Sequence, residues 1–242
     1  MDGLGSFWAE SDAIGRTVVV VLLAMSVSAW VVILWKGWVL QRARHDIARA
    51  VPAFWAADTL AAGHARLAAL DREQVLLPLL QASTTPDAPG TLATRSPHAS
   101  QLTRRLRDAL HRGLAHLQFG QVLLASIGST APFIGLFGTV WGIYHALVAI
   151  SAAGAISIDK VAGPVGEALV MTAAGLAVAI PAVLAYNLFG QWVAACEAEL
   201  EGFAHDLLEL AQGGESTHPP THPSTTAPTD QATGLAKPQP GA

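Results

Sequence analysis

The sequence predicts an all-α membrane protein with three transmembrane helices and long helical extensions on the cytoplasmic side. Hydrophobic residues make up 52% of the 242-residue chain and charged residues only 13%, and the mean hydropathy is +0.41. These values are typical of membrane proteins and not of soluble domains. A hydrocarbon core about 30 Å thick requires roughly 20 mostly apolar residues in a helix, and three segments of the chain meet that requirement.

The first span is predicted at residues 17–38, with no charged residue between Val18 and Trp35. Acidic residues outnumber basic ones before it, and Trp35, Lys36 and Trp38 mark its end. A secretory signal peptide instead has a basic start and a small-residue cleavage site, so we interpret this segment as a retained span. Its terminal tryptophans and lysine are expected to meet the lipid headgroups.

Residues 39–120 are predicted to form a cytoplasmic helical loop. Eleven of the chain's 14 Lys and Arg residues lie between Lys36 and Arg112, and loops rich in these residues stay in the cytoplasm. Leucines recur every three or four residues from Leu102 to Leu117, a spacing typical of an amphipathic helix. We expect this helix to run unbroken into the second span.

The second and third spans are predicted at 121–150 and 163–192, joined by a short periplasmic link at 151–162. No Asp, Glu, Lys or Arg occurs from Leu114 to the end of the second span, and Glu167 is the one ionisable carboxylate in the third. A carboxylate at membrane depth costs on the order of 2 to 3 kcal/mol, so it usually faces a partner or a water-filled cavity. Glu167 is therefore a functional candidate.

The two ends of the chain are assigned by composition and topology. Residues 193–212 are expected to continue the third span as an acidic, amphipathic cytoplasmic helix. Residues 213–242 are rich in Pro and Thr and are expected to be disordered. With the large loop in the cytoplasm, three spans place residues 1–16 in the periplasm and the C-terminus in the cytoplasm.

Two threonines are predicted to lie at the same depth in the membrane. Counted from the middle of the link, Thr139 and Thr172 are almost equally far along their spans, and Glu167 is nearer the outer surface. A threonine in a membrane helix most often bonds to its own backbone, but two at one depth favour a shared polar pathway. His145, near the outer end of the second span, is interpreted as an interfacial hydrogen-bonding residue, with a proton relay as the alternative.

Small residues on the second and third spans predict close contact between helices. Glycines recur every seven residues in the second span, and small residues at spacings of three and four form a narrow face of the third. This narrow face is expected either to line a passage or to pack against a neighbouring helix. The packing positions are Gly128, Gly135, Gly138 and Gly142 in the second span and Gly175 and Ala179 in the third.

The sequence carries no signature of a familiar enzyme class. It has no P-loop, no HExxH and no GxSxG motif. A single cysteine, Cys196, and the tail histidines His218 and His222 make no convincing metal site, and we expect no cofactor and no nucleic-acid partner. Transport, force transmission and scaffolding remain as functional classes.

Two blocks of sequence resemble one family of membrane proteins. The run GSTAPFIGLFGTVWGI at 128–143 and the run EALVMTAAGLAVAIPAVLAYN at 167–187 are similar to the ExbB/TolQ/MotA family of proton-channel stator proteins. Three spans with a large loop after the first look like ExbB or TolQ, and not like the four-span MotA pattern. The first block looks more like ExbB, whereas His145 after WGIY looks like TolQ, so the subtype stays open.

The resemblance implies a pentamer in the bacterial inner membrane around an ExbD-like or TolR-like partner, whose membrane Asp takes up and releases protons. The family's pore threonines correspond to Thr139 and Thr172, and its intramembrane glutamate corresponds to Glu167. The complex would couple the proton motive force to a TonB-like protein for outer-membrane transport such as siderophore uptake. The alternatives are a TolQ-like role in the Tol-Pal system, with a TolA-like protein, and a passive transmembrane scaffold.

Overall fold

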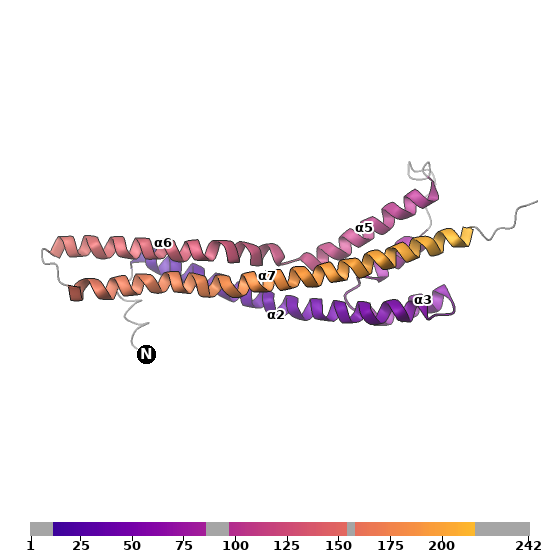
Figure 1. Cartoon of the computed structure of the whole chain (residues 1–242), viewed down its shortest axis with the longest axis horizontal. Coiled ribbons are helices and arrows are strands. Elements are labelled where there is room, and N and C mark those ends of the chain that lie inside the picture. The colour runs from indigo at the N-terminus through magenta and orange to yellow at the C-terminus, as the bar shows by residue number, and fades with distance from the viewer. Residues whose placement is uncertain (1–11, 86–96, 154–157, 216–242) are drawn as a thin grey trace, which may run out of the picture.

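The structure is an elongated arrangement of helices, seen side-on in Figure 1. It is a computed structural model that describes residues 12–85, 97–153 and 158–215, and each regular element within these ranges is a helix. The predicted disordered tail from 216 onward and most of the N-terminal segment 1–16 lie outside the described residues. The helices are α2 (Ala13–Trp55), α3 (Leu60–Leu70), α4 (Leu77–Thr84), α5 (His98–Gln118), α6 (Gln121–Ala153) and α7 (Ile158–Glu215).

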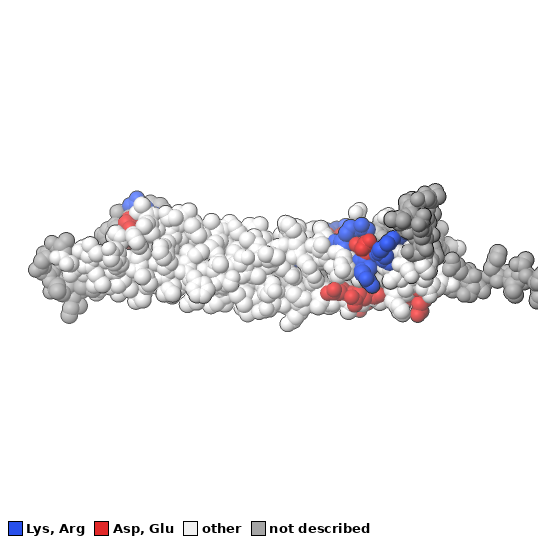
Figure 2. All heavy atoms as spheres, turned by 90° about the horizontal axis from the view of Figure 1, so that it is seen from above, with Lys and Arg blue, Asp and Glu red and all other residues white. Residues whose placement is uncertain are grey.

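Three of these helices are long and apolar enough to cross a membrane, which confirms the predicted three spans. The candidate segments are Ala13–Trp55, Gln121–Ser151 and Ala162–Gln212. On the face seen in Figure 2, charged side chains gather over the part of the molecule that contains α5, with a small group near the other end. The uncharged stretch between them is what a surface in contact with lipid requires.

Two of the spanning helices are much longer than a membrane is thick. α7 has 58 residues, which at 1.5 Å per residue gives a length of about 87 Å, whereas the hydrocarbon core takes only about 30 Å. α2 has 43 residues, and both helices continue past the uncharged stretch toward the same end of the molecule (Figure 1). The membrane bundle and the extension therefore share continuous helices.

The buried core of the chain continues from the membrane bundle into the extension. Phe54 of α2 and Phe203 of α7 are buried and meet edge-on, with ring centroids 5.3 Å apart. The carboxylate of Asp71 accepts three consecutive backbone N–H groups leading into α4, at 2.7 to 2.9 Å, and so fixes the turn between α3 and α4. Leucines of α5 complete this core, as their three-to-four spacing predicts.

The helix predicted to run unbroken into the second span is interrupted, so that prediction is wrong. α5 ends at Gln118 and α6 begins at Gln121, and between them Phe119 has an extended ψ of 136° and Gly120 a φ of 84°. A positive φ is readily adopted only by glycine. The break lets α5 turn its leucines onto α4 and α7, while α6 enters the apolar bundle.

Lys36 does not meet the headgroups, which also differs from the expectation. Its side chain is 0% exposed, although Trp35 and Trp38 are both exposed. The reason is helical periodicity, because Lys36 lies seven residues after Ala29 and four before Leu40, on the buried stripe of α2. Its Nζ has no hydrogen-bond partner among the described residues.

Candidate functional site

α6 and α7 approach each other so closely that only glycine fits at their crossing. A Cβ atom added at Gly135 would lie 2.6 Å from the carbonyl oxygen of Met171 and 3.1 Å from the Cα of Gly175. A Cβ atom at Gly175 would lie 2.6 Å from the carbonyl oxygen of Ala131. The two backbones are therefore in direct contact, as small residues allow in membrane helices.

The other small residues predicted to pack also face neighbouring helices. A Cβ atom at Gly128 would lie 2.5 Å from a valine side chain of α7, and one at Gly142 would lie 2.9 Å from an alanine side chain of α7. A Cβ atom at Gly138 would meet a methionine of α7 at 2.5 Å and a valine of α2 at 2.9 Å, and Ala179 is buried. The narrow face of the third span thus packs against α6 within the same chain, one of the two uses expected for it.

Thr139 and Thr172 meet one helical turn from this crossing. Their hydroxyl groups are hydrogen-bonded to each other, and Thr139 Oγ1 also lies 3.1 Å from the carbonyl oxygens of Gly135 and Ala168. A hydroxyl carries a single proton, so Thr139 can donate to one carbonyl while it accepts the proton of Thr172. The two residues therefore lie at the same level of the α6–α7 pair.

The two threonines differ in how far they reach the surface of the chain. Thr139 is buried, and Thr172 is half-buried. When Thr172 donates to Thr139, the lone pairs of its oxygen remain available to a donor outside the chain, such as water or a protonated carboxyl group. The pair therefore links buried backbone carbonyls to the surface through hydroxyl groups that can rotate.

Glu167 lines a cavity near the N-terminal end of α7. The cavity has a volume of about 300 Å³ and lies between the start of α2, the second half of α6 and the first part of α7. Its walls include Gly142, Pro164 and Ala168 beside Glu167. The cavity has room for several water molecules, and an ionisable group in a membrane helix usually faces a cavity of this kind or a polar partner.

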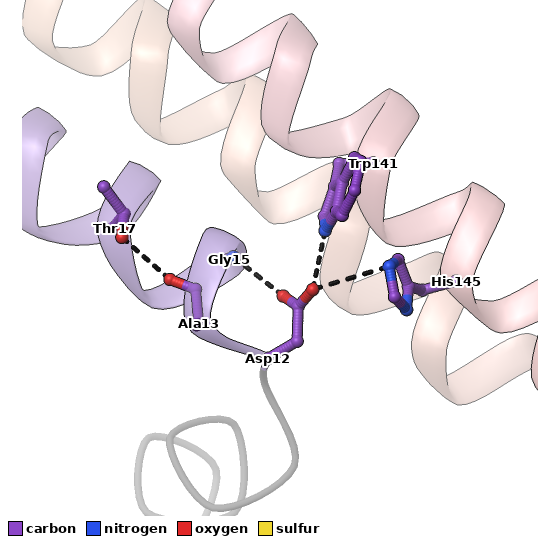
Figure 3. A network of polar contacts seen from close by, with 6 residues as sticks. All are labelled: Asp12, Ala13, Gly15, Thr17, Trp141 and His145. Atoms are coloured by element: carbon purple, nitrogen blue, oxygen red, sulfur yellow. Dashed lines mark hydrogen bonds and ion pairs between the residues drawn. The ribbon is translucent and has the colours of Figure 1, made fainter.

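A polar network that the sequence reasoning missed joins α2 to α6 at this cavity (Figure 3). Asp12 caps α2 by accepting the N–H of Gly15 at 2.8 Å through Oδ1. Its Oδ2 accepts the indole N–H of Trp141 at 2.7 Å and lies 3.5 Å from Nε2 of His145. An aspartate before an apolar helix is a capping signal, and Trp141 and His145 share a helix face at a spacing of four. No sequence pattern connects groups 129 residues apart.

The environment of Asp12 favours its ionised form. Burial on its own would raise the pKa of the carboxyl group, but the hydrogen bonds from Gly15 and Trp141 and the positive charge of His145 outweigh it, and the pKa lies below its ordinary value. Asp12 is therefore a carboxylate at neutral pH. It places a negative charge beside the first turn of α2.

The groups that the structure assembles can exchange protons and hydrogen bonds. They are two hydroxyls, two carboxylates, an imidazole and an indole N–H, all at or between the three long helices. Among the described residues, no three His, Cys, Asp or Glu side chains are grouped so that they could hold a metal ion.

The profile of the MotA/TolQ/ExbB proton channel family matches residues 73–202. The chain belongs to this family. The matched region contains Thr139, Glu167 and Thr172, whereas Asp12 lies before it. Together with three apolar helices, membership in this proton channel family makes the chain a multi-pass protein of the inner membrane.

Individual members of the MotA/TolQ/ExbB family match between about half and more than four fifths of the chain. Biopolymer transport protein ExbB of Xanthomonas campestris pv. campestris (strain B100) is 40% identical over 210 residues, 84% of this chain and 83% of that protein. The ExbB of Neisseria gonorrhoeae is 53% identical over 116 residues, 48% of this chain and 53% of that protein. Tol-Pal system protein TolQ of Haemophilus influenzae is 31% identical over 211 residues, 83% of this chain and 90% of that protein. These relatives confirm the resemblance, with higher identity to proteins named ExbB.

Proposed function

We propose that this chain is an ExbB-type subunit of a proton-driven motor in the inner membrane. It forms a homopentamer around an ExbD-like single-span partner and couples the proton motive force to a TonB-like protein for energised outer-membrane transport. Its N-terminus faces the periplasm and its C-terminus the cytoplasm. Family membership and the higher identity to proteins named ExbB support this proposal over the alternatives.

The observation that carries the proposal is the contact between Thr139 and Thr172. A protonated carboxyl group on the partner would donate to Thr172, which donates to Thr139, which donates to a backbone carbonyl. An ionised carboxylate would instead accept from Thr172, and Thr139 would then donate to Thr172. The pair can therefore satisfy both protonation states of a partner Asp by rotating two hydroxyls, without moving a helix.

Glu167 has a separate role in this proposal. It lines the cavity near the N-terminal end of α7, and in this proposal its carboxylate carries protons between extracytoplasmic water and the partner. Thr139, Thr172 and Glu167 thus border one proton path.

The proposal is tested by energised siderophore uptake in cells that lack their own ExbB system and express this chain with its partner. Thr139→Val, Thr172→Val and Glu167→Ala are expected to abolish uptake while the protein still assembles in the membrane. Thr139→Ser and Thr172→Ser keep the hydroxyl and are expected to retain uptake. Thr130→Val is the matched control, because Thr130 is exposed on α6 and bonds only to its own backbone at Ser126. Normal uptake in the two valine variants would refute the site.

A TolQ-type subunit is the second candidate. The relative named TolQ matches 83% of this chain, and His145 after WGIY favours that subtype. Rescue of detergent tolerance, without rescue of siderophore uptake, would select it. A passive scaffold, by contrast, would keep its function without a proton gradient and after Glu167→Ala.

A further inference from the structure

The outer cavity brings together ionisable groups from three helices. Asp12 at the start of α2, His145 on α6 and Glu167 on α7 all line it, and no other described residue in its wall is ionisable. Of these three ionisable groups, the proposed function uses only Glu167. Asp12 and His145 contact each other at the rim of the same cavity.

His145 is held in place but still open to water. Its Nε2 lies 3.5 Å from Asp12 Oδ2, and its side chain is 48% exposed. The ring of Trp141 lies against the imidazole, with centroids 4.8 Å apart, and Tyr144 meets it edge-on at 5.6 Å. Imidazole is the side chain that changes charge most readily near neutral pH.

Asp12 is the positioning group of this arrangement. Two donors from different helices, the N–H of Gly15 and the indole N–H of Trp141, fix its two oxygens (Figure 3). The carboxylate therefore presents Oδ2 to His145 in one orientation. Arg16, on the next turn of α2, donates its backbone N–H to the carbonyl oxygen of Asp12 at 3.1 Å and does not line the cavity.

We propose that Asp12 and His145 form a proton-collecting site, which takes protons from extracytoplasmic water and passes them through water in the cavity to Glu167. A ring nitrogen of His145 binds a proton from outside water. The imidazolium then releases it through cavity water to a carboxylate oxygen of Glu167, and His145 returns to its neutral form. Asp12 stays ionised throughout and orients the ring. This inference rests on the proposed function, because it takes Glu167 to be part of the proton path.

The test measures the rate of energised uptake against external pH in cells that express the full chain with its partner. At about pH 6, where protons are abundant, the His145→Gln variant is expected to transport at close to the wild-type rate. At about pH 8 its transport rate is expected to be about tenfold below that of the wild type. Asp12→Asn is expected to change the profile in the same direction by a smaller factor. The control is His116→Gln, because His116 pairs with Glu73 at 3.9 Å in the extension, far from the cavity, and it is expected to follow the wild-type profile.

The outcomes separate this inference from the proposed function. If the wild-type chain restores no uptake, or if Glu167→Ala transports normally, the proposed function fails and the collecting site fails with it. If both behave as proposed but His145→Gln follows the wild-type profile, only the collecting site is overturned. If His145→Gln lowers the uptake rate by the same factor at every pH, the collecting site is also overturned, because that result is expected when the Asp12–His145 contact only holds α2 against α6. Rates are normalised to the amount of each variant in the membrane, and Asp12→Asn decides alone if His145→Gln does not accumulate.

Discussion

Single residues at the α6–α7 crossing set how closely the two helices pack. Gly175→Ala would place a methyl group 2.6 Å from the carbonyl oxygen of Ala131, so the helices must separate. We expect a loss of about 1 to 3 kcal/mol in stability, measured as a lower thermal unfolding midpoint in detergent. Gly202→Ala is the control on the same helix, because nothing lies within 4 Å of its added Cβ and alanine favours a helix. Equal midpoints for the two variants would contradict the crossing.

Asp12 predicts a pH dependence of stability. Its pKa is lower in the folded chain than its ordinary value, so its contribution is complete above that ordinary value of 3.8 and is lost as the pH falls through the folded pKa. Wild type is expected to unfold at a higher temperature than Asp12→Asn at neutral pH, and the difference is expected to shrink as the pH falls below 3.8. If the difference in unfolding temperature between the two proteins stays constant as the pH falls, the charge of Asp12 does not contribute to stability.

The residues of the site were predictable to different degrees. Thr139 and Thr172 could be paired from the sequence because counting along two regular helices is enough to compare depths. The contact of Asp12 with Trp141 and His145 could not, because it depends on how the first turn of α2 lies against α6. The burial of Lys36 was missed for a different reason. A lysine between two tryptophans has the composition of a membrane border, and this composition suggested exposure to headgroups.

At the scale of helices, the apolar runs predicted the three spans because span length is a local property of the sequence. The break at Gly120 is not local. A φ of 84° is adopted because α5 docks on α4 and α7, and the leucine spacing of α5 shows which face docks without showing the direction in which the helix leaves. Helix type was therefore predictable, and helix continuity was not.

An aromatic side chain, Phe203, lies in the contact between α2 and α7 in the extension. Phe203 is 1% exposed and contacts Phe54, so Phe203→Ala leaves a cavity in the core of the extension. We expect a loss of about 3 to 5 kcal/mol, measured by thermal unfolding and by faster proteolysis of the extension. Leu210→Ala on the same helix is the control, because Leu210 is 48% exposed, and it is expected to unfold like the wild type.

At the scale of the whole molecule, the distribution of charge predicts how the chain is oriented. Cysteines introduced at Ile14 and Glu209, both exposed, are tested with a membrane-impermeant maleimide in a Cys196→Ala background. The Ile14→Cys variant is expected to react in intact cells, and the Glu209→Cys variant only after the inner membrane is opened. The reverse pattern would place the N-terminus in the cytoplasm and overturn the proposed topology.

The continuity of α7 has a mechanical consequence. The same helix carries Thr172 and Glu167 near one end and the aromatic contact of the extension near the other. A rod of about 87 Å that pivots by about 5° at one end swings its other end sideways by about 8 Å. A tilt of α7 that barely disturbs the helix contacts around Thr172 would thus displace the aromatic contact at the other end of the molecule by several ångströms.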